Sequence, residues 1–581
     1  MMTFRSRLFP VLLGMSLLTA CAGTMKTAPE PAAAGPEAGK ATADTDENLP
    51  KVALTPEILY ELLVGEIAGQ QGQIAVAAST LGKVAQQTRD PRIAERATLA
   101  GLYAKHYDEA LQSARLWVEL EPRDIEAREA LITSLLELDR MPEAKSQFES
   151  LFGLEEERQN LDQAYLRAAA VLARASNRAG ATDIMRSLVA LHPQQASAHF
   201  AMAHLMVRGG DLDKALIADE EALKLRPDWE EAALFKARIL LSQKEPQKAR
   251  AFYESFLDSN PGATGVRLNY ARFLIDQKEW QKALEEFKRV AADVPNDADT
   301  IYAVGLLSLQ NNRLDDAEKY LKQALALRPQ NDQARLYLGQ VAEQAKRYPE
   351  AAGWYREITN GEYFFEAQVR LGIVTAKQGD LPGARRLLNG VVAQNDAQRV
   401  QVALAQEQIL REAKEFRAAF EVLNDALKTV PDDKDLLYAR ALAAEKLGMF
   451  DVTERDLRAI LKQDPKNVNA LNALGYTLTD RTTRYQEALV LLQQAMALKP
   501  DDAFILDSMG WLQYRLGNNA EAVKYLKHAL ELRNDAEIAA HLGEVLWVMG
   551  NHREAESVWS RALHDTPDSE ALTSVIKKYK P

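Results

Sequence analysis

Apolar residues recur at helical spacing along most of the chain, in pairs of short amphipathic segments. Residues 299–332, "DTIYAVGLLSLQNNRLDDAEKYLKQALALRPQND", show the pattern in full. Bulky side chains repeat every three or four positions in both segments: Tyr302, Leu306 and Leu309, then Tyr320, Leu321 and Leu325. Asn311 and Asn312 are typical of a turn, and Pro329 cannot continue the second segment. The pattern therefore predicts a helical hairpin.

The hairpin repeats every 34 residues. Prolines mark the period at Pro193, Pro227, Pro261, Pro295 and Pro329, and the register returns at Pro431 and Pro465. Pro500 follows after 35 residues and Pro567 after a further 67. A fixed period of this length indicates a repeat array, and it overrules the several separate domains that 581 residues would otherwise suggest. Because one hairpin cannot cover its own apolar face, the units must stack into a solenoid.

A small residue in the second helix marks each unit and predicts about fifteen hairpins. These markers are Ala77, Ala110, Ala144, Ala181, Ala215, Ala249, Ala283, Ala317, Ala351, Ala384, Ala419, Thr453, Ala488, Ala522 and Ala555. The register weakens in two places: about three residues are inserted between 150 and 165, and the proline is missing around "NGEYFFEAQ". There, Tyr363 to Phe365 are either an exposed contact patch or packing within a degenerate unit.

The period and its small residues resemble the tetratricopeptide repeat. The best match is residues 468–500, "VNALNALGYTLTDRTTRYQEALVLLQQAMALKP", which has one extra residue in the turn. The family pattern falls on Leu471, Leu474, Gly475, Ala488, Leu492, Ala495 and Pro500. The resemblance implies an all-α solenoid curled into a superhelix, with a groove that binds peptides.

The N-terminus reads as a lipoprotein signal. Arg5 and Arg7 precede an apolar stretch, residues 8–18, that is too short to span a bilayer. The following Leu-Thr-Ala-Cys tetrad ends in Cys21, the only cysteine of the chain, and resembles the bacterial lipobox. That resemblance implies cleavage before Cys21 and acylation (palmitate among the chains), and Ala22 implies sorting to the outer membrane. An ordinary signal peptide with an unrelated cysteine is the alternative.

Residues 22–50 and the net charge predict an acidic folded region that is joined to its membrane anchor by a flexible tether. Residues 22–50 are rich in Ala, Pro, Thr and Gly, which predicts a disordered tether reaching about 30 Å. Removal of residues 1–20 leaves 69 basic and 83 acidic residues, a net charge of −14. Such a surface disfavours nucleic acid and anionic lipid. Membrane contact is therefore expected only through the lipid anchor.

The chain is thus expected to have five parts. They are a signal peptide (1–20), the lipidated cysteine and tether (21–50), degenerate N-terminal repeats (51–165), the main repeat array (166–566) and a C-terminal capping helix (567–581), whose sequence includes "SEALTSVIKKYK".

No catalytic constellation appears in the sequence. The eight histidines form no HExxH or other paired-ligand motif, and we expect structural or surface roles for them. There is no P-loop and no GxSxG. We therefore expect neither an enzyme nor a cofactor or metal site.

The repeat resemblance supplies candidate binding residues instead. Carrying the groove positions of the family's first helices onto the C-terminal units selects aromatic, Asn and Arg side chains, the types that often dominate binding energy. They are Asn469, Asn472, Tyr476, Phe504, Asp507, Trp511, Tyr514, Arg515 and Trp547. Packing between helices is the competing explanation for the aromatic members.

Residues 54–98 resemble the start of a proteobacterial family of outer-membrane repeat lipoproteins that hold a carboxy-terminal processing protease. The resemblance implies a non-catalytic periplasmic adaptor that binds this serine protease and its protein substrates, cell-wall hydrolases among them. It also implies docking of the protease on the N-terminal helices, here through Ile58, Leu59, Leu62, Leu63 and Glu66. An assembly factor for a pilus, a secretin or polysaccharide export remains the alternative.

Overall fold

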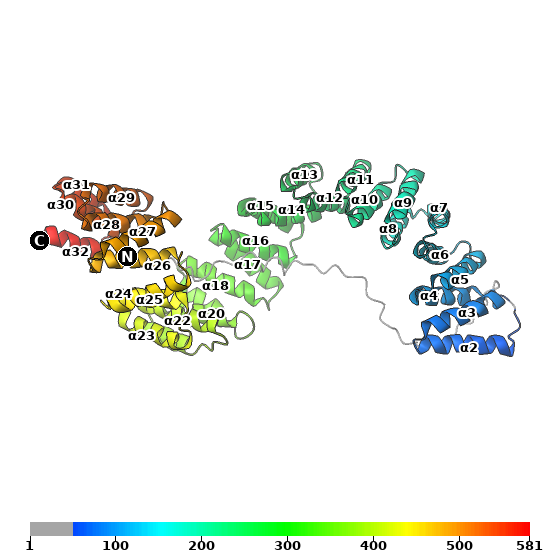
Figure 1. Ribbon diagram of the computed structural model, residues 1–581, viewed down its shortest axis with the longest axis horizontal. Coiled ribbons are helices and arrows are strands. Elements are labelled where there is room, and N and C mark those ends of the chain that lie inside the picture. The colour runs from blue at the N-terminus through cyan, green and yellow to red at the C-terminus, as the bar shows by residue number, and fades with distance from the viewer. Residues whose placement is uncertain (1–49, 51, 581) are drawn as a thin grey trace. The chain divides into compact units, whose positions relative to one another are not determined.

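The computed structural model describes residue 50 and residues 52–580, and all regular structure in this part of the chain is α-helical (Figure 1). The all-α prediction is confirmed. The signal peptide, Cys21 and the tether up to residue 49 lie outside the described residues.

The helices form two compact units that divide between Pro295 and Asn296. The boundary lies inside the array of residues 166–566. The first unit contains α2 (Pro56–Gln70), α3 (Ile74–Thr88), α4 (Pro91–Tyr103), α5 (Tyr107–Leu120), α6 (Ile125–Glu137), α7 (Met141–Glu157), α8 (Leu161–Leu172), α9 (Arg178–Leu191), α10 (Ala196–Gly209), α11 (Leu212–Leu225), α12 (Glu230–Ser242), α13 (Pro246–Ser259), α14 (Thr264–Asp276) and α15 (Trp280–Asp293).

The second unit begins after this boundary and contains the remaining helices. These are α16 (Ala298–Gln310), α17 (Leu314–Leu327), α18 (Asp332–Gln344), α19 (Tyr348–Arg356), α20 (Phe364–Lys377), α21 (Leu381–Asn389), α22 (Asp396–Glu412), α23 (Phe416–Thr429), α24 (Lys434–Lys446), α25 (Phe450–Gln463), α26 (Val468–Arg481), α27 (Tyr485–Leu498), α28 (Ala503–Arg515), α29 (Asn519–Leu532), α30 (Ala536–Val548), α31 (His552–Asp565) and α32 (Glu570–Tyr579).

Helices α2 to α31 pair into fifteen hairpins, in agreement with the repeat count, and α32 follows the last one. Each of the fifteen marker residues lies in a second helix, α3, α5 and so on to α31, and each is at most 2 % exposed. The small side chain is required because the two helices of a hairpin approach most closely there.

The hairpin of α16 and α17 shows the local causes. A Cβ atom placed on Gly305 would lie 2.8 Å from Cγ of Leu321, so a larger residue here would force the side chain of Leu321 to move. Asn312 makes the turn in the left-handed region at φ 57°, which asparagine tolerates. Helix α17 ends at Leu327, two residues before Pro329.

At the two places where the repeat register weakens, the helices differ in length from those of the regular units. Helix α7 extends to 17 residues where the insertion was predicted. Around "NGEYFFEAQ", α19 and α21 shorten to nine residues each, and α22 lengthens to 17. Tyr363 and Phe365 pack against neighbouring cores, whereas Phe364 is 38 % exposed, so the segment serves mainly packing.

The core of each unit is a series of separate clusters between successive hairpins, as expected for a repeat array. At the C-terminal end, Leu572 and Val575 of α32 are buried in the cluster that contains Trp559. Within the described residues, none of the helices has the length and hydropathy needed to cross a bilayer.

Candidate functional site

Four of the predicted groove residues line one cavity in the second unit. Asn472 and Tyr476 project from α26, and Phe504 and Asp507 project from α28. All four belong to first helices of successive hairpins, because the 34-residue period places equivalent positions on the same side of each unit. The structure therefore brings together residues that the sequence could only assign one by one.

The cavity, here called the α22–α30 pocket, has a volume of about 280 Å³. Its other lining residues come from the first helices α22, α24, α26, α28 and α30, from the turn after α22 and from the first residue of α23: Glu407, Arg411, Glu412, Lys414, Phe416, Leu442, Ala443, Glu445, Lys446, Ala473, Ser508 and Glu537. The residues from α22 and α24 were missed by the sequence analysis. The proline register is interrupted before them, and groove positions were carried over only from residue 469 onward.

Asp507 is held by a histidine one repeat later. Nδ1 of His541 lies 2.9 Å from Oδ1 of Asp507, and both residues are buried. The ring of His541 also stacks on Trp511, with 4.3 Å between centroids. Burial alone would lower the pKa of His541, but the charge and hydrogen bond of Asp507 outweigh it and raise the pKa above its usual value.

Three more predicted residues do not line the pocket and instead contact side chains and backbone of their own or the preceding hairpin. Trp511 Nε1 donates to Oδ1 of Asp480 at 3.3 Å. Arg515 donates to the carbonyl oxygen of Asp480 at 3.2 Å and to the hydroxyl of Tyr485 at 3.0 Å. Tyr514 is half-buried beside Trp511. These contacts connect α28 to the preceding hairpin.

The two remaining candidates lie apart from the pocket. Asn469, in the first turn of α26, is exposed. Trp547, at the end of α30, stacks on His552 at 4.2 Å and on Trp559 at 5.6 Å, next to Tyr579 of α32. Trp547 thus contributes to the packing of the C-terminal cap.

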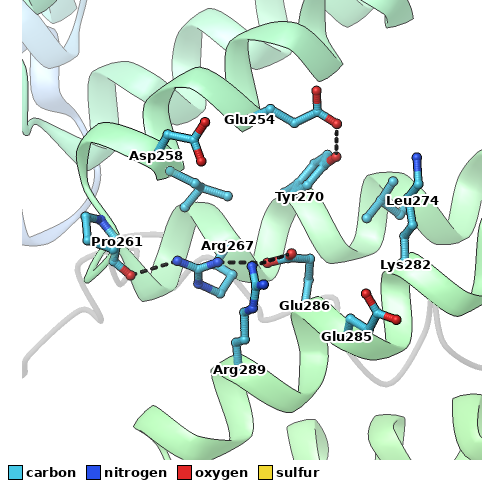
Figure 2. Close-up of a pocket in the computed structure, with 11 residues that line it drawn as sticks. Glu254, Asp258, Pro261, Arg267, Tyr270, Leu274, Lys282, Glu285, Glu286 and Arg289 are labelled. Atoms are coloured by element: carbon cyan, nitrogen blue, oxygen red, sulfur yellow. Dashed lines mark hydrogen bonds and ion pairs between the residues drawn. The ribbon is translucent and has the colours of Figure 1, made fainter.

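A larger cavity of about 570 Å³ lies among α13, α14 and α15 of the first unit (Figure 2). Arg267 donates to Oε2 of Glu286 at 2.8 Å and to the carbonyl oxygen of Pro261 at 2.7 Å, and Tyr270 donates to Glu254 at 2.7 Å. These hydrogen bonds give partners within the protein to Arg267 and Tyr270, the two buried polar side chains among them. We therefore interpret it as an internally braced cleft between hairpins.

The predicted docking helix, α2, carries an apolar face that the described residues leave uncovered. Leu59 is 42 % exposed and Leu63 is 50 % exposed, as is Ile67 one turn further on, while Ile58 and Leu62 are half-buried. These positions follow the helical spacing of four residues.

Glu66, the fifth predicted docking residue, lies at a neighbouring cavity of about 620 Å³ between α2, α3 and α4. It forms an ion pair with Arg96 of α4, and the exposed side chains of Leu99 and Tyr103 lie on the same rim. The apolar face of α2 and this cavity are together called the N-terminal face.

The part of the chain that the structure describes contains no cluster of three or more His, Cys, Asp or Glu side chains able to hold a metal ion.

Comparison with known proteins identifies the repeat. The tetratricopeptide-repeat profile matches residues 200–264, 302–363, 438–503 and 508–571, and a second profile of the same repeat matches residues 240–304. The TPR repeat-containing protein PA4667 of Pseudomonas aeruginosa is 33 % identical over 492 residues, covering 85 % of this chain and 83 % of that protein.

Two solved structures give weaker likenesses. A thermophilic TPR protein of Thermus thermophilus is 23 % identical, with a TM-score of 0.29, over 32 % of this chain and 98 % of that one. A tetratricopeptide repeat protein from Parabacteroides merdae is 16 % identical, with a TM-score of 0.33, over 48 % of this chain and 97 % of that one. On the repeat matches and the long alignment with the Pseudomonas protein, the chain belongs to the tetratricopeptide-repeat family, whose arrays typically act as non-catalytic scaffolds for protein–protein interaction.

Proposed function

We propose that this protein is a lipid-anchored adaptor on the periplasmic face of the outer membrane that binds a protease and the protein substrates of that protease. The observation that carries the proposal is the presence of two surfaces that the described residues leave open, one in each unit: the N-terminal face and the α22–α30 pocket. A scaffold needs at least two such surfaces, because it acts by bringing two partners together.

The N-terminal face is suited to a folded partner. Monomeric proteins rarely expose contiguous apolar surface without a use for it, and here Leu59, Leu63 and Ile67 lie on successive turns of one helix. We assign this face to the protease, in keeping with the family resemblance of residues 54–98. The α22–α30 pocket is narrower and is assigned to an extended segment of substrate.

The mechanism is proximity. A protease and a substrate held on one chain meet at an effective concentration in the millimolar range, without any chemistry by the scaffold itself. Acylation of Cys21, which lies outside the described residues, would confine both partners to the membrane surface.

The direct test is capture of partners from solubilised envelope by the tethered protein. A protease recovered together with cell-wall hydrolases supports the adaptor. Recovery of pilus, secretin or polysaccharide-export subunits in their place would contradict it and favour an assembly factor.

A pair of matched variants tests the assignment of the N-terminal face. Leu63→Glu places a charge in the middle of the apolar face of α2, whereas Ile217→Glu places the same charge at a 61 % exposed position on α11. We expect Leu63→Glu, like deletion of residues 51–100, to abolish recovery of the protease, and Ile217→Glu to leave it unchanged. Retention of the protease by the Leu63→Glu protein would refute the assignment.

A further inference from the structure

The α22–α30 pocket is hollow because small residues lie where bulky ones would fill it. Ala443, Ala473 and Ser508 are each at most 9 % exposed and line the pocket from three successive first helices. Larger apolar side chains surround them, from Phe416, Leu442, Tyr476 and Phe504. The result is an apolar recess with a polar rim.

Its volume limits what can enter. At about 280 Å³ the pocket lies just below the range of about 300–1,000 Å³ that is usual for small-molecule sites. It can therefore take one or two side chains of a protein segment. An apolar wall favours a bulky apolar side chain.

One buried polar group in the pocket has no partner. Asn472 is 3 % exposed and lines the recess, and its Oδ1 atom accepts no hydrogen bond from any described residue. A buried acceptor without a donor is rare, because its lost hydration is not replaced. The same oxygen would be satisfied by an N–H group brought in by a ligand.

Acidic side chains outnumber basic ones in the lining of the pocket. Five carboxylates line it, against three basic side chains. Two of the bases are already engaged, Arg411 with Glu407 at 2.7 Å and Lys414 with Glu570 of α32 at 2.5 Å.

Glu445, on α24, is one of these carboxylates. Its side chain makes neither a hydrogen bond nor an ion pair within the described part of the chain, and burial raises the pKa of its carboxyl despite the nearby charges of Lys446 and Arg481. A desolvated carboxylate of this kind is stabilised by an added cation.

We propose that the pocket binds a basic, apolar segment of a partner protein, inserting one bulky apolar side chain while an adjacent Lys or Arg meets Glu445 and an N–H group donates to Asn472. The proposal rests on the adaptor function, since it names the kind of substrate segment that the adaptor takes. Acidic segments and nucleic acid are disfavoured by the same carboxylates.

The test uses three capped nine-residue peptides that differ only at their centre, within a Gly/Ser frame: Lys-Phe-Lys, Glu-Phe-Glu and Lys-Ala-Lys. Binding to the full-length protein is measured by isothermal titration calorimetry at low and at physiological salt. We expect Lys-Phe-Lys to bind at least about tenfold more tightly than either of the others, and its advantage over Glu-Phe-Glu to shrink as salt is added. Equal affinity for the three peptides would overturn the proposal.

Two variants locate the binding. Glu445→Gln removes the charge from a half-buried side chain and should reduce the affinity for Lys-Phe-Lys about five- to tenfold, and with it the preference over Glu-Phe-Glu. Asn472→Leu removes the acceptor and should weaken both Phe-containing peptides. The matched control is Glu421→Gln, at an exposed position on α23, which should change neither. If Glu445→Gln has no larger effect than Glu421→Gln, the pocket is not the site.

The same variants separate this inference from the adaptor function. If the peptides discriminate as expected but Glu445→Gln captures the same hydrolases from envelope as the wild type, the pocket chemistry stands and its assignment to those substrates fails. If capture is lost while the peptides do not discriminate, the adaptor function stands and the pocket chemistry fails.

Discussion

The cleft of α13–α15 in the first unit and the α22–α30 pocket in the second unit use polar residues in opposite ways. In the cleft of α13–α15, Arg267 is bound on two sides by protein, to Glu286 and to the carbonyl oxygen of Pro261 (Figure 2). In the α22–α30 pocket, Oδ1 of Asn472 accepts no hydrogen bond and the carboxylate of Glu445 forms no ion pair within the described residues. In similar hairpins, polar side chains can thus either hydrogen-bond within the protein and stabilise it, or remain able to bind a partner.

The largest effect is expected from removing Arg267, whose hydrogen bonds stabilise the cleft of α13–α15. Arg267→Ala leaves Glu286 largely buried without its main partner, and breaking such a pair costs about 3–5 kcal/mol. We expect hydrogen exchange in α13–α15 of the full chain to accelerate accordingly. Arg289→Ala removes a 64 % exposed partner of the same carboxylate and should have a small effect. Equal effects of the two variants would show that the two hydrogen bonds of Arg267, to Glu286 and to Pro261, do not stabilise the cleft.

Asp219 extends the comparison to an acid that lines neither the cleft nor the pocket and accepts no hydrogen bond from the described residues. It is fully buried in α11, neither carboxylate oxygen accepts a hydrogen bond from the described residues, and burial raises its pKa to about 8. A raised pKa in the folded state favours folding at low pH, so the stability of the surrounding helices should fall as pH rises from about 4 through about 8.

Asp219→Asn should remove this pH dependence and stabilise the region by about 2–4 kcal/mol at pH 7. Hydrogen exchange in α10–α12, followed as a function of pH, measures the effect. Asp228→Asn, at an exposed position, is the control. A wild-type protein whose local stability rises over this pH range would contradict the assignment.

In the second unit, the pair of His541 and Asp507 should give a smaller pH dependence. The folded pKa of His541 is raised, so its stabilising contribution is complete below about 6.5 and is lost as pH rises through the folded value. Glu544 and Asp480 also act on the ring and raise its pKa. In the Asp507→Asn protein, the stability of α28 and α30 should depend less on pH above about 6.5. An unchanged profile in the variant would mean that another group titrates.

The smallest effect is expected from the contact between Lys414 and Glu570. Both side chains are mostly exposed, so the ion pair gains little over hydration. Lys414→Ala should leave the melting temperature unchanged, whereas Leu572→Ala should loosen α32, because Leu572 is fully buried. Release of α32 by Lys414→Ala in hydrogen exchange would show that the ion pair, and not the buried contact of Leu572, holds the C-terminal helix.

The repeat period alone determined the fold of the described chain. Each of the fifteen marker residues lies in a second helix, and Gly305, Asn312 and Pro329 do in the structure what their chemistry predicts. This succeeds because helix spacing, turn preference and close approach are local properties that each 34-residue unit repeats. The lipid anchor, the localisation and the partners remain predictions.

Only the tertiary structure decided which groove residues share a site. Sequence placed Asn472 and Trp547 in one candidate set, yet the first lines a pocket and the second packs against Trp559. It also gave no reason to pair His541 with Asp507 or to select Glu445. The physical reason is that the period fixes the face on which a side chain lies. Whether its hydrogen bonds and charge are satisfied depends on residues supplied by neighbouring units, 30 or more positions away.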